Sequence, residues 1–240
     1  MTYLQILLFK HSLRIKHLWK QIGRNEALQD ELLLEHTYNS TSIEGATFTK
    51  RETESVIFHK AIVQNKSLIE HLEATNHAAA LRDILQKTYD GPITEVFVKD
   101  MHHNLLQGIH PDAGIYAKHQ RVIRGVDLVL THPEDISEEM TRLIRNWQRK
   151  SGRAPIREIA RFHVEFELIH PFGDGNGRVG RLLLTFQCLE HDYVPVVVEN
   201  DRKAEYYDTL EYAQRESEGP FVRFIVEEME RTHRLLVKYL

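Results

Sequence analysis

The chain has 240 residues, of which 42% are apolar and 28% charged, and its 31 basic and 35 acidic side chains give a formal net charge of -4. This composition excludes wholesale disorder, and the lack of a basic excess argues against a general binder of nucleic acids or anionic membranes. Cys188 is the only cysteine, so an internal disulfide and zinc sites built on several thiolates are excluded. The length predicts one large domain, or one domain with a short extension.

The first residues do not resemble a signal peptide, because the apolar run at 6–9 is too short and no small-residue cleavage site follows it. No run approaches the roughly 18 apolar residues of a membrane-spanning helix. We therefore expect a cytoplasmic protein without a membrane partner.

Apolar residues recur at helical spacing along most of the chain. The first predicted helix runs from about residue 26 to 44 and stops at Gly45, and Thr94 suits the N-cap of a helix that continues to residue 106. Further helices are predicted at 53–65, 67–87, 137–150, 156–169, from about 176 onward, 202–216 and 220–240. At about 121–131 two short runs of β-forming residues flank a turn and predict a hairpin. The predicted fold class is mainly α with one small β-hairpin.

The most informative stretch runs from His170 to Arg181 and combines glycines with an imidazole, a carboxylate and two guanidinium groups. Glycines at 173, 175 and 177 allow a tight turn and a close approach to a ligand, and the helix that begins at about Asn176 offers free amides to an anion. Arg178 and Arg181 project from the first turn of this helix, where cations oppose the dipole by roughly 0.3–1 kcal/mol unless an anionic ligand compensates. Asp174 is a hard oxygen donor suited to magnesium beside phosphates.

Taken alone, this loop also fits a plain turn that follows a structural histidine. A calcium-binding EF-hand loop is excluded, because Arg178 falls at its fifth position and the distal glutamate is not at the required spacing. A Walker loop is excluded, because no Gly-Lys-Ser/Thr sequence follows the glycines.

The stretch resembles the signature of the Fic family, His-Pro-Phe-x-Asp/Glu-Gly-Asn-Gly-Arg-x-x-Arg, with every fixed position present. The resemblance extends from roughly residue 40 to 224 and implies a Fic-type helical bundle that transfers AMP from Mg-ATP to a protein hydroxyl. It implies an N-terminal helical region at 1–90, which carries an inhibitory helix at about 26–45. The Fic core would span 91–240, with a hairpin flap at about 121–131 and the catalytic loop at 170–181.

The resemblance also implies roles for the residues of the loop. His170 would be the general base for a target Ser, Thr or Tyr hydroxyl, and Asp174 would hold Mg²⁺. Glycine at position 177 favours AMP transfer over phosphorylation, since the related Doc kinases carry lysine there. The α-phosphate would bind the amides of Gly175, Asn176 and Gly177, other phosphate contacts would come from Arg178, and the γ-phosphate would pair with Arg181.

A second motif lies at the end of the first predicted helix, where Ser40 and Glu44 share a face and Gly45 follows. A carboxylate at a helix C-terminus is unfavourable unless a cation answers it, and on its own the stretch fits a solvated helix end with a glycine cap. It resembles the Fic inhibitory motif Ser/Thr-x-x-x-Glu-Gly/Asn, placed N-terminally as in class II members. That resemblance implies a salt bridge from Glu44 to Arg181 that displaces the γ-phosphate. Some relatives also use this glutamate to orient water and remove AMP.

The predicted hairpin matches the position of the family's flap, in which Val122, Ile123 and Arg124 would pair with an extended target segment. A hairpin that only caps the bundle fits the same pattern. Many family members have Gly-x-Tyr-Arg just before the flap, whereas here Ala117 takes the place of the arginine. This departure bears on how the flap is anchored.

A helix that follows the catalytic loop resembles the one that lines the adenine pocket in relatives. Aromatic pairs at helical spacing also fit a core position, and His163 is expected to be structural. The residues assigned to the adenine pocket are Tyr206, Tyr207, Leu210 and Gln214.

These observations together predict a self-inhibited protein adenylyltransferase with Mg-ATP as co-substrate and an unidentified target protein. Two alternatives stay open. One is an enzyme, alone or bifunctional, that uses Glu44 to remove AMP, and the other is a non-catalytic nucleotide-sensing or partner-binding module. Nucleic acid is not expected as a partner, while self-modification stays open, as does a homodimer, since dimers are common among relatives.

Overall fold

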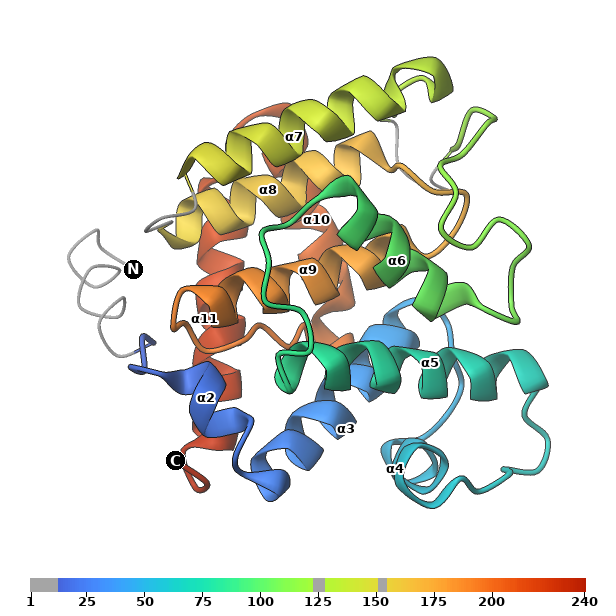
Figure 1. Ribbon diagram of the computed structural model, residues 1–240, viewed down its shortest axis with the longest axis vertical. Helices are drawn as coiled ribbons and strands as arrows, with labels where there is room; N and C mark the ends of the chain where they lie inside the picture. The colour runs from blue at the N-terminus through green and yellow to red at the C-terminus, as the bar shows by residue number, and fades with distance from the viewer. Residues whose placement is uncertain (1–12, 123–127, 151–154) are drawn as a thin grey trace.

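The computed structural model describes residues 13–122, 128–150 and 155–240 (Figure 1). In these residues the chain is built almost entirely from helices, and the predicted mainly-α fold class is confirmed. Short 3₁₀ helices at Pro133–Asp135 and Asn200–Arg202 precede two of the α-helices. The α-helices are α2 (Leu18–Ile22), α3 (Glu26–Ile43), α4 (Lys50–His59), α5 (Leu68–Leu85), α6 (Glu95–Leu106), α7 (Ile136–Lys150), α8 (Ile156–Ile169), α9 (Asn176–Glu190), α10 (Lys203–Arg215) and α11 (Gly219–Leu236).

Side-chain caps fix where several helices begin. Thr94 accepts a hydrogen bond from a backbone N–H in the first turn of α6, as the sequence predicts. The prediction of a helix at 53–65 was wrong at both ends. Thr49 and Glu52 form a capping box that starts α4 earlier, and Lys60, in the left-handed region at φ 52°, ends it.

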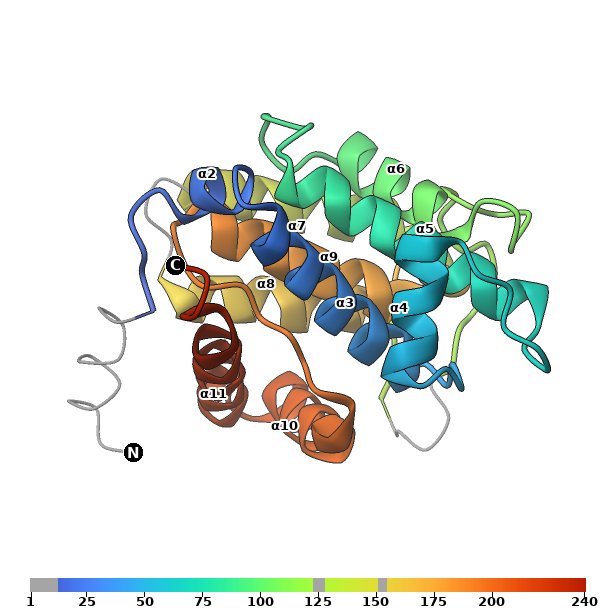
Figure 2. The same ribbon diagram turned by 90° about the horizontal axis from the view of Figure 1, so that it is seen from below.

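Helix α9 is the central element of the fold, and every residue from Arg178 to Leu189 is buried. It packs against α2, α3, α5, α6 and α8, and Figures 1 and 2 show it surrounded by these helices. The sequence pattern suggested one apolar stripe, but a helix enclosed by neighbours buries side chains all round. The core therefore holds α9 rigidly, and with it the loop that precedes its first turn.

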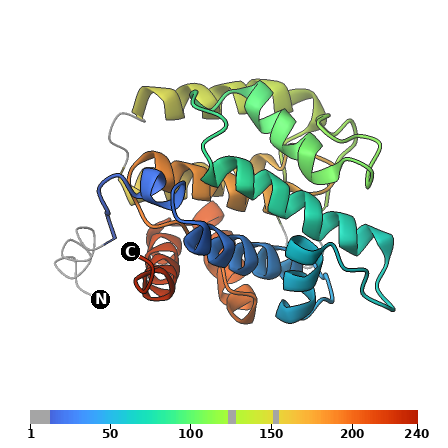
Figure 3. The ribbon, with the colours of Figure 1, turned by 60° about the horizontal axis from the view of Figure 1, so that its bottom comes forward.

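The other helices form layers around α9. In Figure 3, α9 (orange) lies between α7 (yellow-green) above and α3 (blue) below, while α10 and α11 (red) lie beneath. Helix α3 contacts α4, α5 and α9, whereas α10 packs on α8 and α11. Three helices of the predicted N-terminal region, α2, α3 and α5, thus contact the predicted Fic core through α9, and the division at residue 90 stays a prediction.

The predicted flap lies in the connection between α6 and α7. No strand is assigned to the described residues of 121–131, and residues 123–127, which include the docking candidates Ile123 and Arg124, lie outside the described residues. Val122 is 81% exposed. The hairpin therefore stays a prediction, and the one bridge among the residues described joins Arg14 and Tyr193 in antiparallel fashion.

Two sets of hydrogen bonds connect the chain before and at the start of the predicted flap to neighbouring segments. The backbone N–H of Ala117 donates to the Pro171 carbonyl over 2.9 Å. The Arg121 guanidinium donates to the carbonyls of Thr131 and Ile169 over 2.9 and 3.0 Å. Anchoring at Ala117 thus uses the backbone, which the departure from arginine leaves intact. In the part of the chain that the structure describes, no helix is both long and apolar enough to cross a membrane.

Candidate active site

The end of α8 places His170 beside a cavity. His170 is the C-cap residue, with φ 49° and ψ 59°, and its backbone N–H donates to the Phe166 carbonyl. A non-glycine residue in the left-handed region costs roughly 1–2 kcal/mol, and such strain is concentrated at functional sites. The side chain is 20% exposed and lines a cavity of about 230 Å³.

Side chains from inside and outside the loop hold its shape. The Asn176 amide donates to the Phe172 carbonyl and accepts from the Phe172 N–H, both over 2.8 Å. His102 of α6 stacks on the Phe172 ring at a centroid distance of 3.7 Å. Its Nδ1 accepts from the Gly114 N–H, so Nε2 carries the proton and donates to the Asp174 carbonyl over 3.0 Å. Asn176 and His102 thus fix the loop from opposite sides.

The first turn of α9 begins at Asn176, within the range that the sequence predicts. Gly175 is the N-cap at φ 76°, and its N–H donates to the Asp174 carboxylate over 2.7 Å. The backbone N–H groups of Asn176 and Gly177 lie at the open end of the helix, where no intrahelical acceptor is available. These two amides are suited to bind an anion.

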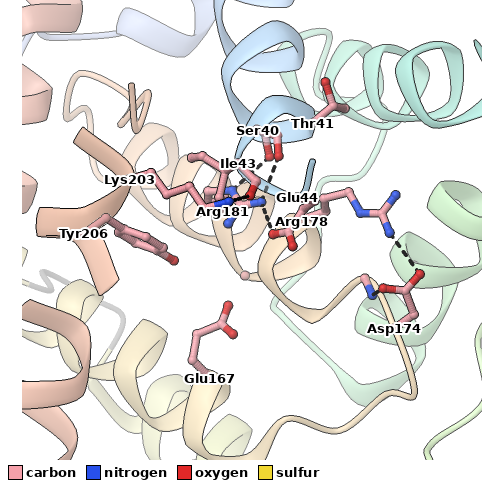
Figure 4. A network of polar contacts seen from close by, with 12 residues as sticks. Ser40, Thr41, Ile43, Glu44, Glu167, Asp174, Arg178, Arg181, Lys203 and Tyr206 are labelled. Atoms are coloured by element: carbon pink, nitrogen blue, oxygen red, sulfur yellow. Dashed lines mark hydrogen bonds and ion pairs between the residues drawn. The ribbon is translucent and has the colours of Figure 1, made fainter. Parts of the chain in front are cut away.

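Arg178 is directed away from the cavity. Its guanidinium donates to Glu73 of α5 over 2.8 Å and to Asp174 over 3.2 Å, as Figure 4 shows for Asp174. The Arg178 side chain is only 3% exposed, whereas that of Asp174 is 56% exposed. Burial raises the pKa of Glu73, although the Arg178 charge acts in the opposite direction. Phosphate binding by Arg178 stays a prediction.

Arg181 is bound by the end of α3. Its Nε donates to Ser40 Oγ over 2.9 Å, and one terminal nitrogen donates to the Ser40 carbonyl over 3.0 Å and to the Glu44 carboxylate over 2.7 Å (Figure 4). The salt bridge that the resemblance implies is therefore present. Lys203 of α10 donates to the carbonyl of Ile43, the last residue of α3.

Gly177 lies directly beneath this ion pair. A Cβ atom at this position would be 2.5 Å from a Glu44 carboxylate oxygen and 2.9 Å from a terminal nitrogen of Arg181. Only glycine leaves room for the two side chains to meet here. The glycine that the family resemblance associates with AMP transfer therefore also permits the contact between the end of α3 and α9.

The cavity brings together several predicted residues from four parts of the chain. Asp174, Gly175, Asn176 and Arg178 do not line it, and a larger surface hollow of about 550 Å³, beside α2, contains none of the predicted site residues. Size therefore does not identify this site. The lining residues are Glu44, Val122, Leu128, Glu167, His170, Gly177, Arg181, Tyr206, Tyr207, Leu210, Glu211 and Gln214.

The four residues assigned to the adenine pocket all line the cavity, but they differ in burial. Tyr206 is 1% exposed, and its hydroxyl lies 2.8 Å from Nε2 of His163. Nδ1 of the same imidazole lies 3.1 Å from the Gly180 carbonyl, so both nitrogens of His163 have partners. His163 holds Tyr206 in the cavity wall, in agreement with its expected structural role.

Among the titratable groups in the wall, burial shifts the pKa values of His170 and Glu167 in opposite directions. Burial lowers the pKa of His170 to about 4, and Arg121 adds to the effect. Burial raises the pKa of Glu167 to about 8, with Glu44 adding to the rise and Arg181 opposing it. Sequence reasoning did not find Glu167. Its signal was an acidic residue one helical turn before His170 and four residues after His163, on the same face of the helix.

Comparison with known proteins identifies this architecture. A family model described as "Fic/DOC family" matches residues 92–188. "Protein adenylyltransferase Fic" from Culex quinquefasciatus is 32% identical over 211 residues, which cover 85% of this chain and 41% of that protein. The protein of the same name from Nematostella vectensis is 31% identical, over 84% of this chain and 48% of its own length. The chain thus spans less than half the length of these curated relatives.

Solved structures of Fic proteins have the same fold as this chain. A Fic domain containing signaling protein from Bacteroides thetaiotaomicron superposes with a TM-score of 0.81 at 26% identity, covering 92% of this chain and 94% of that chain. A fragment of Fic-1 from C. elegans also gives a TM-score of 0.81, at 27% identity over 96% of this chain and 70% of that chain. Fold and loop together define a Fic-type helical domain. The chain belongs to the Fic/DOC family.

Proposed function

We propose that the protein transfers AMP from Mg-ATP to a hydroxyl of a target protein, and that Glu44 restrains this activity by occupying Arg181. The observation that carries the proposal is the position of the Arg181–Glu44 ion pair, in the same cavity as His170 and next to the first turn of α9. The names of the curated relatives, which are protein adenylyltransferases, support the choice of reaction.

In this proposal His170 accepts the proton of the target hydroxyl while the hydroxyl oxygen attacks the α-phosphate. The amides of Asn176 and Gly177 bind the charge that develops on the phosphate, because donors fixed in advance stabilise such charge without reorganising. Tyr206 and Tyr207 form one wall for the adenine, together with Leu210. The target is a protein segment that brings a hydroxyl to His170, and a segment of this chain can serve as well.

The restraint follows from competition for one guanidinium group. Arg181 is 2% exposed and already has three hydrogen bonds to α3, so a γ-phosphate reaches it only if Glu44 leaves. Burial disfavours the Arg181 charge, but the nearby Glu44 carboxylate raises its pKa above the usual value. Since a carboxylate and a phosphate bind arginine in the same forked geometry, each excludes the other.

Asp174 fits a magnesium ion that is shared with a nucleotide. Its carboxylate is more than half exposed, and the described residues contain no group of three or more potential metal ligands from His, Cys, Asp and Glu. Magnesium is commonly held by one or two carboxylates together with substrate phosphates and water. Asp174 would therefore hold the ion, which supplies neutralising charge at the phosphates when bound.

The test measures label transferred from α-labelled ATP to protein, with the chain alone and with a cell lysate. Glu44→Gly raises the initial rate, and adding His170→Ala to that variant abolishes it. Glu216→Gly is a matched control, because Glu216 is an exposed C-cap glutamate on α10. Unchanged transfer in Glu44→Gly would overturn the restraint, and transfer that survives His170→Ala would overturn the role of the imidazole.

A second reaction, removal of AMP from a modified target, is favoured by one observation. The Glu44 side chain is 33% exposed and lines the same cavity as His170, where a carboxylate can orient a water molecule. This reaction requires Glu44, so it is lost in Glu44→Gly, whereas transfer increases. If Glu44→Gly still removes AMP from a labelled protein at the wild-type rate, the role of Glu44 in this second reaction is overturned.

A further inference from the structure

Glu167 is a buried acid for which the proposed reaction gives no role. It lies one helical turn before His170 on α8 and is 6% exposed. Figure 4 shows its carboxylate directed toward the space between Arg181 and Tyr206. Its Oε1 atom is shielded from solvent and has no hydrogen-bond partner. An unpaired buried polar atom destabilises the folded state, so stability alone does not explain Glu167.

The fold leaves space for this carboxylate. A Cβ atom on Gly180 of α9 would lie 2.3 Å from Glu167 Oε1. Both nitrogens of His163, one polar neighbour, have partners elsewhere. Arg181 is bound by Ser40 and Glu44 through Nε and one terminal nitrogen, and its other terminal nitrogen, Nη1, is buried without a hydrogen-bond partner. The helix-to-helix contact at Gly180 thus keeps an acid in place without pairing it.

The imidazole of His170 is the polar group toward which the second oxygen of Glu167 is directed. Oε2 of Glu167 lies 3.8 Å from Nδ1 of His170, and this nitrogen is also shielded and without a hydrogen-bond partner. The unpaired Nδ1 therefore faces the Glu167 carboxylate, whose other oxygen, Oε1, is also unpaired. Nε2, the other ring nitrogen, is then the one that can face a substrate.

The chemistry of a general base requires such a partner. A neutral imidazole accepts a proton at Nε2 only if the proton it already carries is on Nδ1, and a carboxylate that accepts from Nδ1–H selects this tautomer. A carboxylate also stabilises the imidazolium that forms when the base is protonated. This matters here because burial makes His170 a weak base on its own.

We propose that Glu167 is a positioning residue for His170, whose carboxylate accepts a hydrogen bond from Nδ1–H and leaves Nε2 free to receive the proton of the incoming hydroxyl. The inference rests on the proposed AMP transfer. In that step the target oxygen bonds to the α-phosphorus, the bond to the pyrophosphate oxygen breaks, and pyrophosphate leaves with the electron pair. The hydroxyl proton moves to Nε2, and Glu167 keeps its negative charge throughout.

The proposal gives the imidazole a dependence on pH. Burial raises the pKa of Glu167 to about 8, so below that pH the carboxyl is mostly protonated and donates to Nδ1, which leaves the proton on Nε2. Above it, the ionised carboxylate selects Nδ1–H. The base form therefore becomes populated as pH rises through about 8. The titratable and charged groups that act on this pair are Glu44 from α3, Arg121, Asp174, His163 on α8, Arg181 on α9, and Tyr206 and Tyr207 on α10.

Nitrogen NMR on the nucleotide-free chain tests the pair without using activity. With ¹⁵N-labelled histidine, and the His170 signals assigned by their loss in His170→Asn, the tautomer of His170 switches between pH 6.5 and pH 9.5 in the wild type. It does not switch in the isosteric Glu167→Gln variant. The same tautomer at both pH values in the wild type, or a switch that persists in Glu167→Gln, would overturn the proposal.

Kinetics give the second readout, in the Glu44→Gly background. At pH 9, Glu167→Gln lowers the maximal rate of label incorporation at least about tenfold and leaves the KM for ATP unchanged. Gly180→Ala displaces the carboxylate while keeping its charge, and lowers the same rate. Glu165→Gln is the matched control, because Glu165 lies on the same helix but lines a different hollow, with Arg161 and Trp147.

The outcomes separate the two proposals. A loss that appears only in KM, or an equal loss in the Glu165 control, contradicts the positioning role. If no variant incorporates label, the proposed function fails, whereas the tautomer measurement still decides whether Glu167 and His170 form a pair. Thermal unfolding serves as the control for folding. If the midpoint temperature of Glu167→Gln lies within a few degrees of the wild-type value, the lower rate is not caused by unfolding.

Discussion

Arg178 and Arg181 lie one turn apart on α9, are equally buried at 2% exposed, and are each held by carboxylates, yet they contact different parts of the molecule. Arg181 faces the cavity and pairs with Glu44 at the end of α3. Arg178 faces away and joins Glu73 of α5 to Asp174 of the catalytic loop. A step of three residues turns a side chain about 60° around a helix, which is enough to separate the two partners.

The different partners of Arg178 and Arg181 show that the family signature does not by itself determine which arginine contacts a nucleotide. Two arginines spaced by three residues suggest two phosphate ligands, but only Arg181 has a partner whose removal would expose it to a nucleotide. The Arg178 contacts bind the loop to α5 and leave the Arg178 side chain 3% exposed. We therefore expect changes at Arg181 to alter activity and changes around Arg178 to alter stability.

The largest effect should come from Arg181 itself. In the Glu44→Gly background, Arg181→Ala should lower label transfer from ATP by at least about 100-fold, because a fixed cation at the phosphates contributes strongly to the transition state. Arg181→Lys keeps the charge but not the forked donors and should retain part of the rate. Initial rates at several ATP concentrations measure both. If Arg181→Ala transfers label as fast as the Glu44→Gly background, Arg181 is not the arginine that contacts the phosphates.

The partner of Arg178 provides the opposite experiment. Glu73→Gln removes the carboxylate from a buried guanidinium and should lower the free energy of unfolding by roughly 1–3 kcal/mol. Denaturant unfolding measures the loss, with Glu54→Gln on exposed α4 as the control. Label transfer in the Glu44→Gly background should fall by less than in Arg181→Ala. If Glu73→Gln has the same free energy of unfolding as the wild type, Arg178 does not have the structural role that its contacts indicate.

The sequence predicts those features of the fold that depend on residues close together in the chain, such as helix starts and turns. Thr94 identifies the start of α6 and the glycine-rich loop identifies the start of α9, because caps and turns are local. The Glu44–Arg181 contact was predicted only through the family resemblance. The Arg178–Glu73 contact, between residues 105 positions apart, was not predicted. Periodicity indicates that helices exist, but not which faces meet.

Glu167 illustrates the same limit for the candidate site. Its position one turn before His170 was visible in the sequence, but an acid on a helix is usually solvated. What distinguishes it is the enclosure by α9 and α10, together with the space at Gly180, and both depend on how three helices pack. The predicted start of α4 was wrong for a different reason. The capping box at Thr49 is a local sequence pattern, and the prediction followed the apolar spacing instead.

Ser40 tests how much of the restraint depends on hydrogen bonds other than the ion pair. Ser40→Ala removes the Oγ that accepts from Arg181 Nε, while the Ser40 carbonyl and Glu44 keep their contacts. The lost bond is worth about 1 kcal/mol, so transfer in the otherwise wild-type chain should rise roughly fivefold. Ser42→Ala, two positions along the same helix, should leave the rate unchanged. A rate in Ser40→Ala no higher than in Ser42→Ala would assign the restraint to Glu44 alone.

Lys203 should give the smallest effect and the sharpest view of how α10 supports the restraint. Its ammonium donates to the Ile43 carbonyl at the C-terminus of α3, next to Glu44, and a cation there contributes about 0.3–1 kcal/mol. Lys203→Met should therefore raise transfer about two- to fivefold in the wild type and not at all in Glu44→Gly, where nothing remains to be held. Lys203 also lies 5.9 Å from the Tyr207 ring in the cavity wall. If its main role were in nucleotide binding, the substitution would change the KM for ATP equally in both backgrounds, so the double variant separates the two roles.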